Sequence, residues 1–405
     1  MKDLEQSKFG KMSIDNHHNE WGYTRCAEMD LSKSIHFLLN NAGPVIKYRL
    51  RKEILNNLSP TEEENLLEQI YQTPHFKLLH SYIKPNGYIG SGMHSWDNWR
   101  GVKFHETPLQ DGETAARLLS YYAIPKTHPI IVNYVAAMRN EDILRKEFSY
   151  IPPEIPRFEH RFEGMNNGNC LKSLLYAMQA MLGYGDDYED VREFQQIALK
   201  GFRRILEISS LDEITKISTS AKRRYNYPYI EANDYFPDVY TLTMLAYTQC
   251  WRTDDNKKML AASINHLNMI MKPDNNIHVR INGKFYAPYF AFIRPFRPFS
   301  PDVIDSILYR RPLSEIAMLG VGENVNILSE TIENIKQALS DDGILKMNFG
   351  VPHNKRYSPK KIEYPTAYED VRLEPDYKST TSLMCDLTFW AIELLHLCDN
   401  TSIKV

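Results

Sequence analysis

The sequence has 405 residues, of which 43% are hydrophobic and 24% are charged, and its formal net charge is -3. Such a chain can bury a sizeable core without disulfides, and its charge gives no electrostatic reason to expect nucleic acid or an anionic membrane as a partner. Length alone leaves open several domains or one domain built from repeats.

The cysteines number five, an odd count, and no CxxC pair occurs. This favours free thiols in a reducing compartment. The first residues lack the apolar stretch of a signal peptide, and no run approaches the ~20 apolar residues that a membrane span needs. We therefore expect a cytoplasmic protein without a membrane span. The sequence gives no indication of the oligomeric state.

Residues 1–30 are polar and aperiodic, and they are expected to form an arm outside a single main domain, residues 31–405. From Leu31 onward apolar residues recur at helical spacing. Helices are predicted over residues 31–39, 44–55, from 59 onward, 76–83, 113–123, 129–138, 170–182, 191–206, 238–251, 255–271, 325–339 and 382–397.

Between these helices, residues 140–165, 215–236 and 346–378 are expected to be long connections. Residues 277–300 predict a hairpin-like excursion, because a short extended run there precedes the turn dipeptide Asn282-Gly283. Regular alternation of strands and helices is absent, which excludes a Rossmann-type plan. The expected fold class is therefore all-α, with one or two small β-hairpin excursions.

Three of the predicted helices end in a similar phrase, a tight polar turn followed by an apolar residue. The three turns are Lys84-Pro85-Asn86-Gly87-Tyr88, Lys272-Pro273-Asp274-Asn275-Asn276-Ile277 and Ser340-Asp341-Asp342-Gly343-Ile344. Glycine or asparagine accepts a positive φ where a helix stops, and the next apolar residue can pack back onto it. The irregular spacing predicts stacked helical hairpins rather than a strict array.

This phrase resembles the repeat of α/α-toroid proteins, the group that contains terpenoid cyclases and protein prenyltransferases. Stretches that begin at Gly43-Pro44, Asn169-Cys170 and Pro237-Asp238 are similar to bacterial members of the group. The resemblance covers roughly residues 31–345. It implies an α/α toroid, in which two concentric rings of helices surround a central cavity.

The stretch that begins at Asp111 resembles the acidic motif of class II terpenoid cyclases, in which a buried carboxylic acid protonates the substrate. When the two are aligned on Thr114, the family's proton donor falls on Gly112, which leaves Asp111 and Glu113 as candidate acids. Such an acid needs a pKa raised by burial. The alternative is that Asp111 caps a helix and Glu113 complements its dipole.

A second pair of candidate acids is Asp234 and Asp238, since Asp238 stands at the start of a strongly apolar helix. In a toroid these carboxylates would face the cavity as an acid and its partner. The tyrosines Tyr229, Tyr235 and Tyr240 are candidate substrate-binding residues beside them. The alternative is again a carboxylate that stabilises a helix N-terminus.

Two further segments carry candidate substrate-binding residues. Tyr88, Trp96 and Trp99 lie in or after a glycine-rich stretch, and their rings could stabilise a carbocation or stack on a sugar. Arg294 and Arg297 could clamp a carboxylate or a diphosphate. The alternatives are a packed connecting loop and a surface strap.

The resemblance implies a terpenoid-cyclase-like enzyme that uses a cavity carboxylic acid to cyclise or isomerise a small, largely apolar substrate. A glycan hydrolase or lyase, which needs two carboxylates across a groove, is the alternative within the enzymes. A non-catalytic small-molecule-binding or scaffold protein is the third possibility. Neither the zinc motif of the protein prenyltransferases nor that of the lanthionine cyclases can be placed, so we expect no metal and no cofactor.

Overall fold

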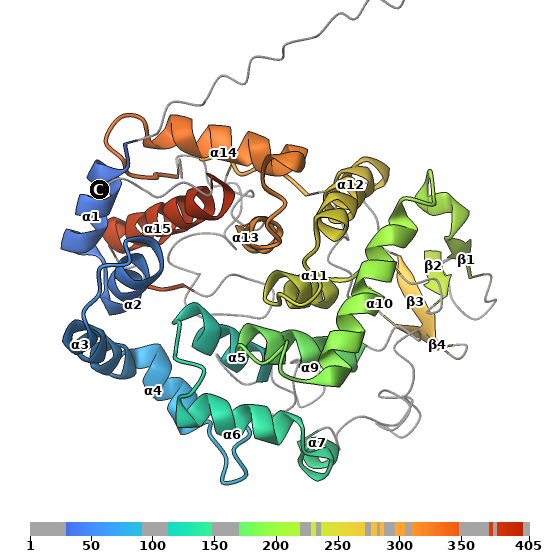
Figure 1. The fold of residues 1–405 in the computed structure, drawn as a ribbon, viewed down its shortest axis with the longest axis horizontal. Coiled ribbons are helices and arrows are strands. Elements are labelled where there is room, and N and C mark those ends of the chain that lie inside the picture. The colour runs from blue at the N-terminus through green and yellow to red at the C-terminus, as the bar shows by residue number, and fades with distance from the viewer. Residues whose placement is uncertain are drawn as a thin grey trace, which may run out of the picture. The chain divides into compact units, whose positions relative to one another are not determined.

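The structure is a computed structural model, and it describes residues 30–90, 112–147, 170–218, 228–231, 236–271, 277–281, 284–286, 296–303, 310–347, 372–375 and 379–399. The chain divides into two units, Met1–Asp30 and Leu31–Val405. The second unit is mostly helical (Figure 1). The predicted helical character is thereby confirmed.

Several helices of the first half begin at sites that the sequence marks. They are α1 (Ser32–Asn41), α2 (Pro44–Arg49), α3 (Pro60–Tyr71), α4 (Pro74–Ser81), α5 (Gly112–Tyr121), α6 (Pro129–Met138) and α7 (Glu141–Glu147). Helices α2, α3, α4 and α6 open with proline, whose missing N–H would have no helical partner there. Helix α3 also has a capping box between Ser59 and Glu62.

The helices of the second half are α9 (Cys170–Met181), α10 (Glu189–Ile205), α11 (Val239–Ala246), α12 (Asp254–Ile270), α13 (Arg310–Met318), α14 (Asn326–Leu339) and α15 (Thr380–Asp399). Three predictions need correction. Helix α7 begins inside the supposed connection of residues 140–165, α13 was not predicted, and the helix expected over residues 238–251 ends at Ala246.

A further correction concerns the helix predicted over residues 44–55. Helix α2 ends at Arg49 and passes into one turn of π-helix, η1 (Leu50–Ile54). In this turn the backbone N–H of Leu55 donates to the carbonyl of Leu50 at 2.9 Å. Such a turn holds one residue more than an α-turn and is frequent at functional sites.

Six helices pack side by side in the order α5, α9, α11, α13, α15 and α2 (Figure 1). Others lie against them as a second layer: α3 packs on α2, α10 on α11, α14 on α13 and α15, and α1 on α15. The apolar stripes of the six meet in the core, where Val45, Leu175, Leu242, Ile316 and Ile392 are buried.

Helix α15 has the length and composition that crossing a membrane would require. Within the protein, however, 61% of its apolar window is buried. It packs against α1, α2, α13 and α14. A central core helix of a folded domain has these same properties.

The strands are β1 (Lys216–Ile217), β2 (Pro228–Glu231), β3 (His278–Ile281) and β4 (Lys284–Tyr286). The antiparallel β3–β4 pair confirms the hairpin predicted around Asn282-Gly283. Strands β1 and β2 pair antiparallel inside the segment that was expected to be a loop. Parallel pairing of β2 with β3 joins the two pairs into one four-stranded sheet.

Candidate functional site

Helices α2, α5, α13 and α15, together with η1 and the residue after α11, surround a cavity of about 280 Å³. This volume is close to the lower end of the range for small-molecule sites. The described lining combines charged, hydroxyl-bearing and aromatic side chains. It consists of Arg49, Glu53, Ser120, Tyr121, Tyr247, Arg310, Ser314, Glu315, Met318, Leu373, Asp386, Phe389, Trp390, Glu393 and Leu397.

The π-turn after α2 forms one wall of this cavity. The guanidinium of Arg49 lies 2.9 Å from a carboxylate oxygen of Glu53 and also pairs with Glu393 of α15. It lies 5.0 Å from the centre of the Phe389 ring as well. Burial lowers the pKa of Arg49, but the charges of Glu393 and Glu53 outweigh burial and raise it, so Arg49 stays a cation.

Helices α13 and α15 form another wall, which is held by polar contacts. Arg310 lies 3.8 Å from Asp386 Oδ1. The other oxygen, Asp386 Oδ2, accepts from the backbone N–H of Leu373 at 3.1 Å. The indole N–H of Trp390 donates to Ser314 Oγ at 2.7 Å. The Trp390 ring is therefore fixed in place while it lines the cavity.

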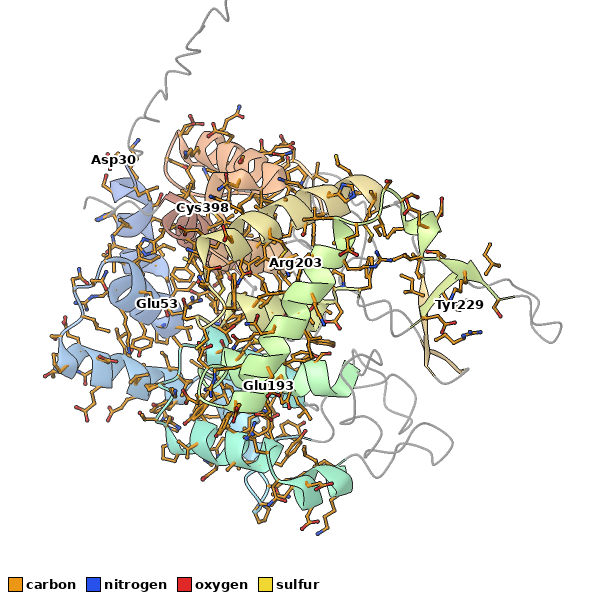
Figure 2. All side chains as sticks on the ribbon, turned by 45° about the vertical axis from the view of Figure 1, so that its right-hand side comes forward. Asp30, Glu53, Glu193, Arg203, Tyr229 and Cys398 are labelled. Carbon is orange, nitrogen blue, oxygen red and sulfur yellow. The ribbon has the colours of Figure 1, made fainter. Side chains whose placement is uncertain are left out.

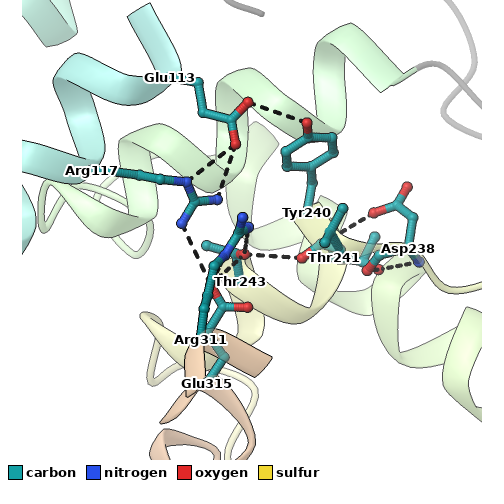
Figure 3. Close-up of polar contacts among 9 residues, drawn as sticks. Glu113, Arg117, Asp238, Tyr240, Thr241, Thr243, Arg311 and Glu315 are labelled. Carbon is teal, nitrogen blue, oxygen red and sulfur yellow. Dashed lines mark hydrogen bonds and ion pairs between the residues drawn. The ribbon is translucent and has the colours of Figure 1, made fainter. Parts of the chain in front are cut away.

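Glu315 connects the cavity to a buried ionic network (Figure 3). On α13, Arg311 Nε donates to Glu315 Oε1 at 3.1 Å. On α5, one turn separates Glu113 from Arg117, and the two pair at 3.1 Å. Arg117 also lies 3.6 Å from Glu315 Oε1, which links the two helices. Arg117 is fully buried, so these charges compensate one another away from water.

Helix α11 adds hydroxyl groups to the same network (Figure 3). The Tyr240 hydroxyl donates to Glu113 Oε2 at 3.2 Å. The Thr243 hydroxyl donates to Glu315 Oε1 at 2.8 Å. Side chains of α5, α11 and α13 thus converge on two buried carboxylates, and one of these, Glu315, reaches the cavity.

Asp238 is buried at the N-terminus of α11. Its Oδ1 accepts from the backbone N–H of Thr241 at 2.8 Å, and the Thr241 hydroxyl completes a capping box. Desolvation raises the pKa of Asp238 to about 6, although the hydrogen bond from Thr241 lowers it. Asp238 therefore caps α11, as one interpretation of the sequence expects. It also has the raised pKa that the other interpretation, a candidate acid, requires. It is not among the described residues that line the cavity.

The raised pKa of Asp238 predicts a pH dependence of stability. The folded state disfavours the ionised carboxylate, so the stabilising contribution of the protonated form is lost as pH rises through about 6. Between about pH 5 and about pH 8 this loss is about 1 kcal/mol. Asparagine is about as good a helix N-cap as aspartate, but its side chain does not ionise.

Urea denaturation at both pH values tests this expectation. Asp238→Asn is expected to remove about 1 kcal/mol of the pH dependence of the free energy of unfolding. The same substitution at Asp255, an exposed residue in the first turn of α12, is the control and should leave the profile unchanged. Equal profiles for the wild type and Asp238→Asn would contradict an elevated pKa.

Two of the predicted site residues, Glu113 and Tyr240, meet directly. Others lie elsewhere. Buried Tyr88 packs edge-on against Tyr134 after α4. Buried Tyr229 lies on β2 (Figure 2), and Arg297 is exposed. The remaining predicted residues fall outside the described part of the chain: Asp111, Asp234, Trp96, Trp99, Tyr235 and Arg294.

Sequence reasoning missed the charged residues of the cavity wall. Asp386 and Glu393 interrupt the otherwise apolar sequence of α15. A carboxylate within such an apolar run is a signal for a buried polar site. Arg117 and Glu315 carried a weaker signal, an opposite charge four residues away on the same helix. Opposite charges at this spacing also occur on exposed helix faces, so the spacing alone does not identify a buried site.

Within the described residues, no group of three or more His, Cys, Asp or Glu is placed to hold a metal ion. Comparisons of the chain with protein-family models, with curated proteins and with solved structures find no match.

Proposed function

We propose that the six helices from α5 to α2 close into the inner ring of an α/α toroid. Two observations support this. Each helix of the series packs on the next, and α1, α3, α10 and α14 cover it as an outer ring would. In addition, residues from both ends of the series, Arg49 at the end of α2 and Tyr121 at the end of α5, line one cavity.

We propose further that this cavity binds a small, hydroxylated molecule of the saccharide class. The observation that carries the proposal is the lining, in which acidic residues and arginines stand beside tyrosines and the aromatic residues Phe389 and Trp390. Sugars present many hydroxyl donors and acceptors together with apolar C–H faces, so this lining matches them. Burial raises the pKa of Tyr247, which keeps its hydroxyl protonated and able to donate.

An apolar isoprenoid fits the described lining less well. It would remove water from Arg49, Glu53, Asp386 and Glu393 without replacing the lost hydrogen bonds. Desolvating polar groups without new partners costs free energy, and this cost opposes binding. A ligand whose hydroxyl groups replace the displaced water avoids it.

Ligand-observed NMR with a defined panel tests the proposal. The panel contains glucose, galactose, mannose and N-acetylglucosamine as hydroxylated probes, and farnesol as the apolar probe. We expect saturation transfer to at least one sugar. Ser120→Leu adds bulk at the cavity wall and is expected to weaken that binding about tenfold.

The matched control is Ser209→Leu, the same substitution at an exposed position outside the cavity. It is expected to leave sugar binding unchanged. Absence of transfer to every sugar would refute the proposal, and so would equal weakening by both substitutions. Turnover of the bound sugar, followed in the same spectra, distinguishes an enzyme from a binding protein.

A second candidate is the acid-catalysed cyclase or isomerase that the resemblance implies. The observation that favours it is buried Asp238, whose pKa is raised to about 6 as a proton donor requires. Conversion of farnesol that is lost in Asp238→Asn would favour this candidate over the saccharide site. Function in the cytoplasm, without nucleic acid or a membrane as partner, is part of both proposals.

A further inference from the structure

The carboxylate of Glu315 has an asymmetric environment. Its side chain is only 2% exposed, yet it is part of the cavity lining. All its contacts within the described part of the chain fall on one oxygen, Oε1. These come from Thr243 Oγ1 at 2.8 Å, Arg311 Nε at 3.1 Å and Arg117 at 3.6 Å.

The second oxygen, Oε2, makes none of these contacts, and Figure 3 shows it turned away from them. A carboxylate oxygen at the wall of a cavity is stabilised by a hydrogen bond that a ligand donates to it. Arg117 and Arg311 both approach the carboxylate from the side of Oε1. Glu315 Oε2 is not among the buried side-chain atoms that lack a partner, so it is accessible from the cavity, and a ligand in the cavity can donate to it.

We propose that Glu315 Oε2 is the acceptor that selects and orients the ligand by binding one of its hydroxyl groups. This inference rests on the proposed saccharide site and adds its specificity-determining residue. Arg117, Arg311 and Thr243 are positioning residues, since they hold Oε1 and thereby aim Oε2. The cavity then distinguishes a ligand that donates a hydrogen bond at this point from one of equal shape that only accepts.

Substitution of Glu315 by glutamine changes the group that faces the cavity from a hydrogen-bond acceptor to a donor. The three partners of Oε1 are all donors, so the amide oxygen of Glu315→Gln takes the place of Oε1. The NH₂ group then faces the cavity, and an acceptor becomes a donor. The substitution changes the shape of the cavity little, which makes it a test of hydrogen-bond direction.

The probes are the three hexoses of the panel and their monodeoxyfluoro analogues, in each of which fluorine replaces one hydroxyl. Fluorine keeps the approximate size but cannot donate. We expect that, for the wild type, one analogue of the bound hexose loses about tenfold or more in affinity by calorimetry. In Glu315→Gln that hexose and this analogue are expected to bind equally weakly.

Two further variants serve as a second substitution at Glu315 and as a control at an exposed glutamate. Glu315→Asp keeps the charge but shortens the side chain, so it should also lose the preference for that hydroxyl if Glu315→Gln does not fold. Glu207→Gln, at a side chain that is 58% exposed, is the control and should keep the preference.

Each outcome has one meaning. If a hexose binds and all its fluorinated analogues bind within about twofold, the role of Glu315 is refuted while the saccharide site stands. The same holds if one analogue is weakened equally in the wild type and in both Glu315 variants. If no hexose binds the wild type, the saccharide site fails and this inference with it.

Discussion

Replacing Arg117 with methionine is expected to lower the free energy of unfolding by about 3 to 5 kcal/mol. Arg117 is fully buried and compensates Glu113 at 3.1 Å and Glu315 at 3.6 Å. Methionine fills much of the same volume but leaves these buried carboxylates with less positive charge beside them. Urea denaturation followed by far-UV circular dichroism measures the loss.

A double variant separates charge from packing. Adding Glu113→Gln to Arg117→Met removes the carboxylate that lost its partner, so the loss is expected to be smaller than for Arg117→Met alone. Arg204→Met at the exposed pair with Glu207 is the control and should cost about 0.5 kcal/mol or less. A loss of that size at Arg117 would show that the buried pair contributes little.

Replacing Gly185 with alanine is expected to cost about 3 kcal/mol, because the loop after α9 has no room for a side chain. An added Cβ would lie 2.4 Å from Thr248 Cγ2 and 2.9 Å from the backbone Cα of Ala180. A side chain can rotate away, but the Ala180 backbone in α9 cannot. Thermal and urea unfolding both report the change.

Two further variants test whether the cost at Gly185 comes from this clash. Gly183→Ala forces alanine into a positive φ of 84° but meets only the flexible side chain of Lys126, so we expect a cost of about 1 kcal/mol. Adding Thr248→Ser to Gly185→Ala removes the nearest methyl group and keeps the hydroxyl, which donates to the Met244 carbonyl. Part of the stability should return; no recovery would place the clash elsewhere.

The sequence predicts helices where apolar spacing and burial agree. In α14, Ile327, Leu328, Ile332, Ile335 and Leu339 are buried at the helical spacing that identified the segment. In α13 the buried face includes Arg310, Arg311 and Glu315, so its pattern of charges is that of a loop or an exposed surface. Burial of ion pairs depends on partners in other helices, which local periodicity does not contain.

The candidate site was predictable only in part for the same reason. Glu113 and Asp238 stand out because of local motifs, and both are buried. The cavity wall instead depends on pairs such as Arg49 with Glu393, which lie 344 residues apart. The π-turn that carries Glu53 to the cavity wall also has no signal in the local sequence pattern, which predicts one continuous helix there.

The packing of α15 against α1 and α2 also constrains how the domain forms during synthesis. Glu393, Asp386 and Trp390 complete the cavity wall, and the ribosome makes them long after the helices they contact. Until then α1 and α2 expose the apolar faces that α15 later covers, which invites association with other chains. Completion of the cavity wall therefore waits until α15 has been made.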